Sequence, residues 1–246
     1  MSQPGCIRTP EVEASLDGRL SSEAAREVTQ HVKACGRCRE RQPEASVYNR
    51  LCDIEWDTPV GPAAACGGNA MLRLSALAES GGFDEVLIAG EEPELCFRLR
   101  RAGWGVQRLA AEMVRHDAAI FSWRQWWQRN QRAGFSYANG CHLHGASSER
   151  YYRRELRSIL FWGLALPVSA LTMAWVHPLG LAILLVYPLQ YWRLKRRFRA
   201  EGRIPAADCG QYAIHLIAGK FPSLLGVLSF HRHRLQGRRR SLIEYK

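Results

Sequence analysis

The sequence predicts an α/β domain between a small helical unit at the N-terminus and a hairpin of transmembrane helices at the C-terminus. Three observations lead to this architecture. Residues 11–34 have the apolar spacing of two short helices, and residues 71–109 combine helical patterns with one short strand. Two uncharged apolar stretches follow at 159–176 and 178–192. The predicted domains are residues 1–40, 41–150 and 151–246.

The N-terminal unit is predicted from two amphipathic patterns joined by a turn. Val12 and Leu16 share one face of the first helix, and Val28 and Val32 share one face of the second. An Asp-Gly pair at 17–18 provides the turn between them.

The middle domain is predicted to contain helices and a short strand. A helix over 71–80 ends at two glycines, which readily terminate helices. A second helix, over 91–101, begins with glutamates that favour the positive end of the helix dipole and with Pro93, which the first turn tolerates. Residues 106–109 suit a strand, and residues 123–133 suit a helix rich in Trp and Arg.

The two apolar stretches near the C-terminus are predicted to cross a membrane as a hairpin. Each approaches the length of about 20 residues that a helix needs to span the roughly 30 Å hydrocarbon core. Arg and Lys flank the outer ends, which places both ends on the cytoplasmic side. A buried pair of soluble helices is the alternative, but Trp and Tyr gather near the ends as in an aromatic belt. Residues 211–230 are also apolar, but they include Lys220 and Pro222, so we expect an interfacial or re-entrant segment.

The excess of basic residues agrees with a membrane location. The formal net charge is +11, from 34 Lys and Arg against 23 Asp and Glu. The basic residues cluster beside the apolar stretches, as in cytoplasmic loops, and no nucleic-acid recognition motif accompanies them. Residues 1–20 hold no apolar signal segment. We therefore expect a multi-pass protein of the inner (cytoplasmic) membrane, with its soluble part in the cytoplasm, its thiols reduced and no nucleic-acid partner.

A group of soft metal ligands lies in the N-terminal unit. His31 and Cys35 are one helical turn apart, and Cys38 follows through a Gly-Arg loop that can return its thiolate to the same point. Cys6 can supply a fourth ligand. Four such ligands in a tetrahedron form a closed structural zinc site, which would stabilise a unit too small to bury much area.

This N-terminal segment resembles the zinc-finger domain of bacterial anti-sigma factors. The resemblance covers about residues 6–40, and it rests on the four metal ligands and on the Leu-Asp-Gly-Arg-Leu-Ser turn at 16–21. It implies a sigma factor as a candidate partner.

Three further motifs follow in order along the chain. The first joins Cys-Gly-Gly-Asn-Ala-Met-Leu-Arg at 66–73 to Gly-Gly-Phe-Asp at 81–84, where glycines permit sharp turns and close approach to a ligand. The second is Glu-Glu-Pro-Glu-Leu at 91–95, with Arg-Leu three residues later. The third combines His-Asp at 116–117 with a Trp- and Arg-rich run at 125–134.

In this order the motifs resemble the acceptor-side half and membrane tail of bacterial family 2 glycosyltransferases, from about residue 39 to residue 246. The resemblance implies a partial GT-A-like fold, in which helices pack on a mixed sheet. It implies inverting transfer of a sugar from a nucleotide-diphosphate donor to a polysaccharide or lipid-linked acceptor, such as those of the cell envelope. A divalent metal, Mg²⁺ or Mn²⁺, would assist.

The resemblance also assigns the catalytic and acceptor-site residues. Glu92 stands where the family has an aspartate, the general base that takes the proton of the acceptor hydroxyl, and Glu91 is the alternative base. The first motif implies an acceptor site formed by Gly67, Gly68, Asn69 and Asp84.

The third motif implies contacts with the donor. Arg129 and Arg132 would hold the diphosphate, and Trp126 or Trp127 would stack on a sugar or nucleotide ring. His116 would bind the catalytic metal. The alternative is a helix at the membrane surface, anchored by its Trp and Arg side chains.

Family members also begin with a nucleotide-binding half that carries an Asp-x-Asp metal motif. No residues before position 40 provide three buried strands or this motif. We therefore expect a truncated or rearranged transferase with weak activity or none on its own. The alternative function is a membrane-tethered, zinc-finger regulator of the anti-sigma type, which would not need the glycosyltransferase-like motifs.

The zinc site can be tested by the metal content of the purified protein with and without Cys35→Ser. We expect about one tightly bound zinc ion per chain, lost in the variant, because the substitution removes a thiolate ligand. The stretch Cys-Gly-Arg-Cys-Arg-Glu at 35–40 also resembles a Cys-Gly-Arg-Arg-Arg-Glu stretch of family 2 glycosyltransferases. A protein without zinc would show that the ligand spacing is a coincidence of that resemblance.

Overall fold

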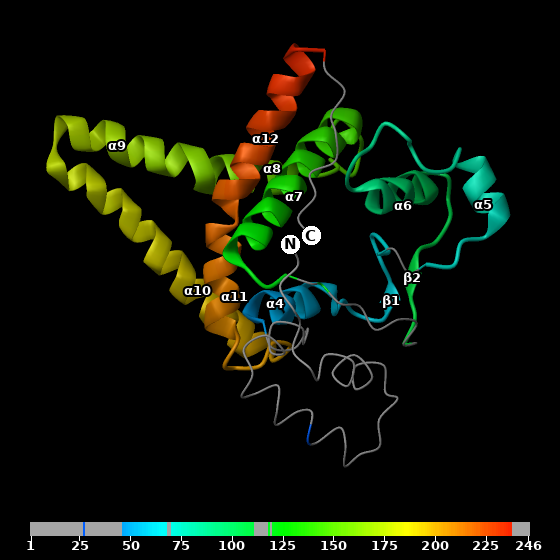
Figure 1. Cartoon of the computed structure of the whole chain (residues 1–246), viewed down its shortest axis with the longest axis horizontal. Coiled ribbons are helices and arrows are strands. Elements are labelled where there is room, and N and C mark those ends of the chain that lie inside the picture. The colour runs from blue at the N-terminus through cyan, green and yellow to red at the C-terminus, as the bar shows by residue number, and fades with distance from the viewer. Residues whose placement is uncertain (1–26, 28–45, 68–69, 111–117, 119, 238–246) are drawn as a thin grey trace, which may run out of the picture. The chain divides into compact units, whose positions relative to one another are not determined.

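The computed structural model describes residues 27, 46–67, 70–110, 118 and 120–237. These residues, drawn in colour in Figure 1, divide between two units. The first unit lies within residues 1–57 and 114–126, and the second lies within residues 58–113 and 127–245. The zinc-finger-like segment falls almost entirely outside the described residues.

The first unit is built around α4 (Val47–Trp56). Ser46 caps this helix by accepting a hydrogen bond from the Tyr48 N–H at 3.1 Å, and its hydroxyl donates to the Ile120 carbonyl at 2.8 Å. The buried Asn49 accepts the Ile120 N–H through Oδ1 at 3.0 Å. Ile120 lies outside any helix or strand. The start of α4 thereby satisfies both its backbone carbonyl and its backbone N–H.

The second unit contains the one sheet of the described residues, a two-stranded antiparallel ribbon. β1 (Gly61–Pro62) pairs with β2 (Gln107–Arg108), with Gly61 opposite Arg108 and Pro62 opposite Gln107. The strand predicted at 106–109 is confirmed, but the larger mixed sheet is not seen in the described part of the chain. The Ala63 N–H donates to the Val106 carbonyl at 2.9 Å, one position beyond Pro62, and the described residues between 63 and 106 form mainly turns and helices.

Two helices follow β1 and frame the acidic motif. α5 (Leu74–Glu79) is shorter than the predicted helix at 71–80, and it ends before Gly81 and Gly82, both at positive φ. α6 (Glu91–Arg101) has the predicted bounds. Ala76 of α5 packs with Leu95 and Leu99 of α6 in a small buried cluster, so the two helices are held together by apolar contact.

α7 (Trp123–His144) extends well beyond the predicted end at residue 133. Gly134 directly follows the predicted end, and glycine commonly ends helices. In the structure Gly134 is instead a packing position: a Cβ there would clash with the Ser223 carbonyl of α12 (Lys220–Leu235). Gly226 plays the reciprocal role, since its Cβ would clash with the Gln131 carbonyl. The missing side chains let the two helix backbones approach closely.

A long interrupted helix follows, and it contains the first predicted membrane stretch. α8 (Arg153–Leu160), a π-helical turn η2 (Phe161–Ala165) and α9 (Leu166–Val176) run continuously from residue 153 to 176. The chain then turns at His177 into a 3₁₀ helix, η3 (Pro178–Leu185), and α10 (Val186–Glu201). Figure 1 shows α9 and α10 as two arms joined at this turn. The predicted stretch at 178–192 thus comprises η3 and the start of α10.

α11 (Cys209–Ala218) and α12 complete the described chain. Two helical stretches, Arg153–Val176 and Cys209–Leu235, have the length and composition that crossing a membrane requires. The second was predicted to be interfacial or re-entrant.

The core of the second unit forms where α12 meets α7 and α8. Its buried side chains come from all three helices: Phe135, Ala138, Ile159, Leu224, Val227 and Phe230. Ile88, in the loop before α6, packs against this cluster. The helical core therefore directly supports the loop that leads into the acidic motif.

Candidate functional site

The acidic start of α6 is the centre of the candidate site. Gly90 precedes it in the left-handed conformation, with φ of 82°, and a Cβ at this position would clash with Ser136 Oγ of α7. Glu91 and Glu92 form the first turn and are half-buried. Glu91 Oε2 is fully buried and has no hydrogen-bond partner among the described residues. A buried carboxylate oxygen without a partner is costly, so it is suited to accept a hydrogen bond from a ligand.

One turn further along α6, Glu94 forms a nearly buried ion pair with Arg98. The Arg98 Nε donates to both carboxylate oxygens, at 2.9 and 3.0 Å, and Nη2 donates to Oε2 at 2.8 Å. Glu94 is only 3% exposed. The parallel, charge-assisted bonds fix the guanidinium plane against the carboxylate.

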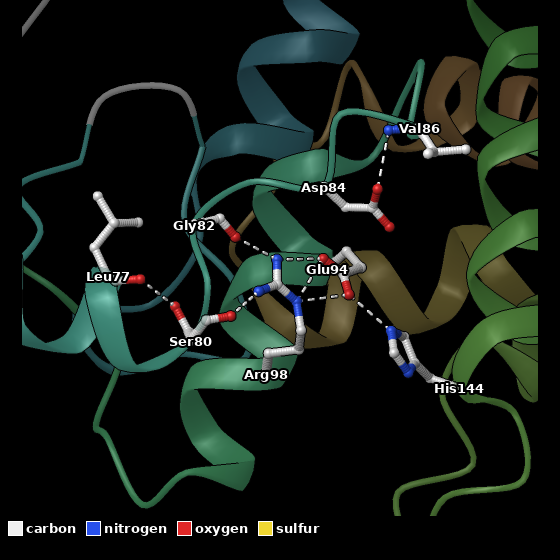
Figure 2. Close-up of polar contacts among 8 residues, drawn as sticks. All are labelled: Leu77, Ser80, Gly82, Asp84, Val86, Glu94, Arg98 and His144. Atoms are coloured by element: carbon white, nitrogen blue, oxygen red, sulfur yellow. Dashed lines mark hydrogen bonds and ion pairs between the residues drawn. The ribbon is translucent and has the colours of Figure 1, made fainter.

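The remaining donors of Arg98 hold the glycine-rich turn that follows α5. Nη1 donates to the Ser80 carbonyl, and Nη2 also donates to the Gly82 carbonyl at 2.7 Å (Figure 2). Both carbonyls belong to the turn after α5, which includes the start of Gly-Gly-Phe-Asp. Arg98 therefore links this part of the first motif to α6, the helix that contains the second motif.

His144, at the end of α7, completes this network. Its Nε2 lies 2.7 Å from Glu94 Oε1, and its ring stacks on Phe97 with 4.5 Å between centroids. Burial alone raises the pKa of Glu94, but the hydrogen bonds from Arg98 and His144 outweigh it and hold the pKa below its usual value. Glu94 is therefore a charged anchor at neutral pH.

One face of α7 contacts the acidic segment, meaning residues 88–94 before and at the start of α6, at three points. Arg132 Nη2 donates to the Ile88 carbonyl at 3.1 Å, Ser136 lies against Gly90, and His144 bonds to Glu94. Positions 132, 136 and 144 are separated by four and eight residues, so they share a helix face. Arg132 was predicted to bind phosphate, and the contact of this helix face with the acidic segment was not predicted. The four-residue spacing of Glu94 and Arg98 was a usable signal for their ion pair, whereas nothing in the sequence connected His144 to Glu94.

Of the predicted acceptor-site residues, Gly67 and Asp84 lie in the described part of the chain. Asp84 is half-buried, and its Oδ1 accepts the Val86 N–H at 2.9 Å, which shapes the turn after the two glycines. Gly67 is exposed. Gly68 and Asn69 lie outside the described residues.

The aromatic and basic residues predicted to hold the donor divide between the two units. Trp126 belongs to the first unit and is 4% exposed, with its ring packed on Trp123 at 4.5 Å and on Tyr48 at 6.4 Å. Trp127 and Arg129 belong to the second unit and are half-buried on α7. Trp127 is the better candidate for stacking on a ligand ring, because Trp126 is almost completely covered.

The predicted metal ligands lie outside the described part of the chain. These are Cys6, His31, Cys35, Cys38 and His116. Within the described part, no group of three or more His, Cys, Asp or Glu side chains could hold a metal ion. We therefore identify no ligands of a catalytic metal among the described residues.

Comparison with known families agrees with both resemblances. The model of a family described as "Glycosyl transferase family group 2" matches residues 52–222, which contain the acidic motif, the glycine-rich turn and α7. The match covers more than half of the chain, so the protein belongs to this family. A second model, described as "Putative zinc-finger", matches residues 11–39, which include His31, Cys35 and Cys38. No curated protein and no solved structure matches the chain.

The Glu94–Arg98 pair can be tested by replacing Arg98 with methionine. We expect Arg98→Met to destabilise the protein by about 3–5 kcal/mol, because a buried carboxylate loses its main partner. The measurement is the unfolding of the detergent-solubilised protein in denaturant. The control is Arg197→Met, which breaks another four-residue pair, Arg197–Glu201, whose side chains are 65% and 40% exposed. That loss should be at most about 1 kcal/mol. Equal effects of the two substitutions would contradict a special role for Arg98.

The lowered pKa of Glu94 also predicts a pH dependence of stability. The folded protein binds fewer protons at this site than the unfolded chain, so the contribution of Glu94 is complete above the unfolded pKa of about 4.3. It is lost as the pH falls below that value and through the lower folded pKa. Unfolding midpoints measured across acidic pH should fall less steeply in Glu94→Gln than in the wild type. Glu201→Gln should keep the wild-type slope, and an unchanged slope in Glu94→Gln would refute the assignment.

Proposed function

We propose that this protein is a membrane-bound glycosyltransferase that moves a sugar from a nucleotide-diphosphate donor to a polysaccharide or lipid-linked acceptor. The observation that carries the proposal is the acidic start of α6. This segment is held in place by contacts of Arg98, Ser136 and His144, while the Glu91 and Glu92 carboxylates are not used in these contacts. A catalytic base requires a carboxylate that is held rigidly in place and remains available to the substrate.

In the proposed reaction, Glu92 accepts the proton of the acceptor hydroxyl. The hydroxyl oxygen attacks the anomeric carbon as the bond from that carbon to the phosphate oxygen breaks, and the nucleotide diphosphate leaves with the electron pair. Attack on the face opposite the leaving group inverts the anomeric configuration. Glu91 is the alternative base, and its unpartnered Oε2 supports a role in binding the hydroxyl.

Basic residues of α7 are proposed to hold the diphosphate. Arg132 donates through Nη2 to the Ile88 carbonyl beside the acidic start of α6, and the planar guanidinium is the group that suits phosphate oxygens. Arg129 lies on the same helix, and Trp127 would stack on a ring of the donor. A bound Mg²⁺ or Mn²⁺ would neutralise diphosphate charge, and we assign it no ligands.

The membrane location is proposed from the apolar helices. Residues 153–176 and 209–235 are long and apolar enough to span a bilayer, and basic residues flank them. The soluble part would then lie at the cytoplasmic surface, where nucleotide sugars and lipid-linked acceptors meet.

The zinc-finger match favours a second candidate function. A zinc-bound unit near the N-terminus of a membrane protein would suit an anti-sigma-type regulator that holds a sigma factor at the membrane. The two functions differ in their dependence on residues, because sigma-factor binding would require the Cys and His ligands but not Glu92.

The catalytic role of Glu92 is tested by glycosyl transfer from UDP-, GDP- and dTDP-linked sugars to lipid extract, using the purified chain in detergent. Any turnover should fall by about 10²–10⁴-fold in Glu92→Gln, because the amide cannot accept the proton. Glu91→Gln, measured in parallel, identifies the alternative base.

The matched control for this assay is Glu85→Gln, which removes an exposed carboxylate from the same segment. This variant should retain wild-type turnover. Robust wild-type turnover would overturn the expectation of weak activity, and turnover insensitive to both Glu91→Gln and Glu92→Gln would refute the proposed site.

A further inference from the structure

Two cysteines lie side by side where the glycine-rich run meets α6. Cys66 immediately precedes Gly67, and Cys96 lies on α6 one turn after Glu92. Their Sγ atoms are 3.3 Å apart, and the Cys66 N–H donates to Cys96 Sγ at 3.4 Å. Cys96 is 1% exposed, whereas Cys66 is half-buried. Cys66 is thus the residue of the pair that is partly exposed to solvent, and its sulfur contacts the sulfur of the buried Cys96.

The environment of the pair favours a reactive sulfur. The hydrogen bond from the Cys66 thiol lowers the pKa of Cys96 to about 6, against the opposing effect of burial, with help from the Cys66 N–H and from Arg100. The same thiol–thiol bond and burial raise the pKa of Cys66. In the pair, Cys66 is therefore the thiol that keeps its proton more strongly, and Cys96 is the sulfur that gives up its proton more readily.

We propose that Cys66 and Cys96 form a reversible disulfide by exchange with a low-molecular-weight disulfide such as oxidised glutathione. In the first step the Cys66 sulfur attacks one sulfur of glutathione disulfide while its proton passes to the neighbouring Cys96 sulfur, and one glutathione thiolate leaves. In the second step Cys96 gives that proton to the released thiolate, attacks the Cys66 sulfur of the mixed disulfide and releases the second glutathione thiolate, which takes a proton from solvent. Two electrons pass from the cysteine pair to glutathione disulfide, which becomes two thiols.

The geometry permits this bond with a small movement. A disulfide is about 2.05 Å long, so the sulfurs need to approach by roughly 1.2 Å from their present separation. Cys96 is held in the helix, but Cys66 lies in an irregular segment next to a glycine, which can absorb the shift. The bond would tie the glycine-rich run to α6 beside its acidic start.

The experiment incubates the full-length protein, purified in detergent, with mixtures of reduced and oxidised glutathione, and then quenches and alkylates the free thiols. Peptide mass spectrometry identifies each cysteine separately. As the oxidised fraction rises, Cys66 and Cys96 should both lose alkylation and appear in one disulfide-linked peptide. Excess reduced glutathione should restore both thiols.

Two variants test the order of the steps. In Cys96→Ser, Cys66 should accumulate a stable glutathione adduct, because no second thiol resolves it. In Cys66→Ser, Cys96 should remain free, since it is buried. The control Cys209→Ser removes a buried cysteine that bonds to the Ile204 and Pro205 carbonyls, and it should leave the linked peptide unchanged.

The wild-type result alone can overturn the proposal, so it does not depend on the folding of any variant. Glutathione adducts on wild-type Cys66 without a linked peptide, or two thiols that stay fully alkylated in excess oxidised glutathione, would refute it. The readout is thiol chemistry, so its outcome is independent of sugar transfer and of the proposed function.

Discussion

A carboxylate withdrawn from water must be paired, and Glu94 meets this requirement through Arg98 and His144. Because Arg98 also binds the Ser80 and Gly82 carbonyls, the same ion pair joins α5, the glycine-rich turn, α6 and α7 (Figure 2). Glu91 and Glu92 stand at the end of the helix that this network fixes. The acids of the motif therefore differ, since Glu94 holds the structure together and the two preceding glutamates take no part in this network.

The support for α7 comes from the apolar helices. Gly134 and Gly226 allow α7 and α12 to pack backbone against backbone, and Phe135, Val227 and Phe230 close the core around them. Helices with the length and composition of membrane spans therefore contact the element that carries Arg132, Ser136 and His144. This arrangement connects the proposed membrane tail physically to the candidate site.

The chain combines a glycosyltransferase family region with a zinc-finger-like segment, and the two have different physical requirements. The family region organises its acids through ion pairs and helix packing, whereas a zinc finger depends on thiolate and imidazole ligands. Cys66 and Cys96 belong to neither scheme. Their contact places oxidation-sensitive chemistry next to the glycine-rich run, within the family region.

The family, the bounds of α6 and the strand β2 could be predicted from the amino-acid sequence, because they depend on local signals: the ordered motifs, the glutamates at a helix start, and a β-pattern. The length of α7 was predicted less accurately. The helix continues through Gly134, and this glycine packs against the backbone of α12. Tertiary structure alone decided the links between distant residues. His144 reaches Glu94 across 50 positions and Cys66 reaches Cys96 across 30, and no local pattern encodes such contacts, because they arise only once helices pack.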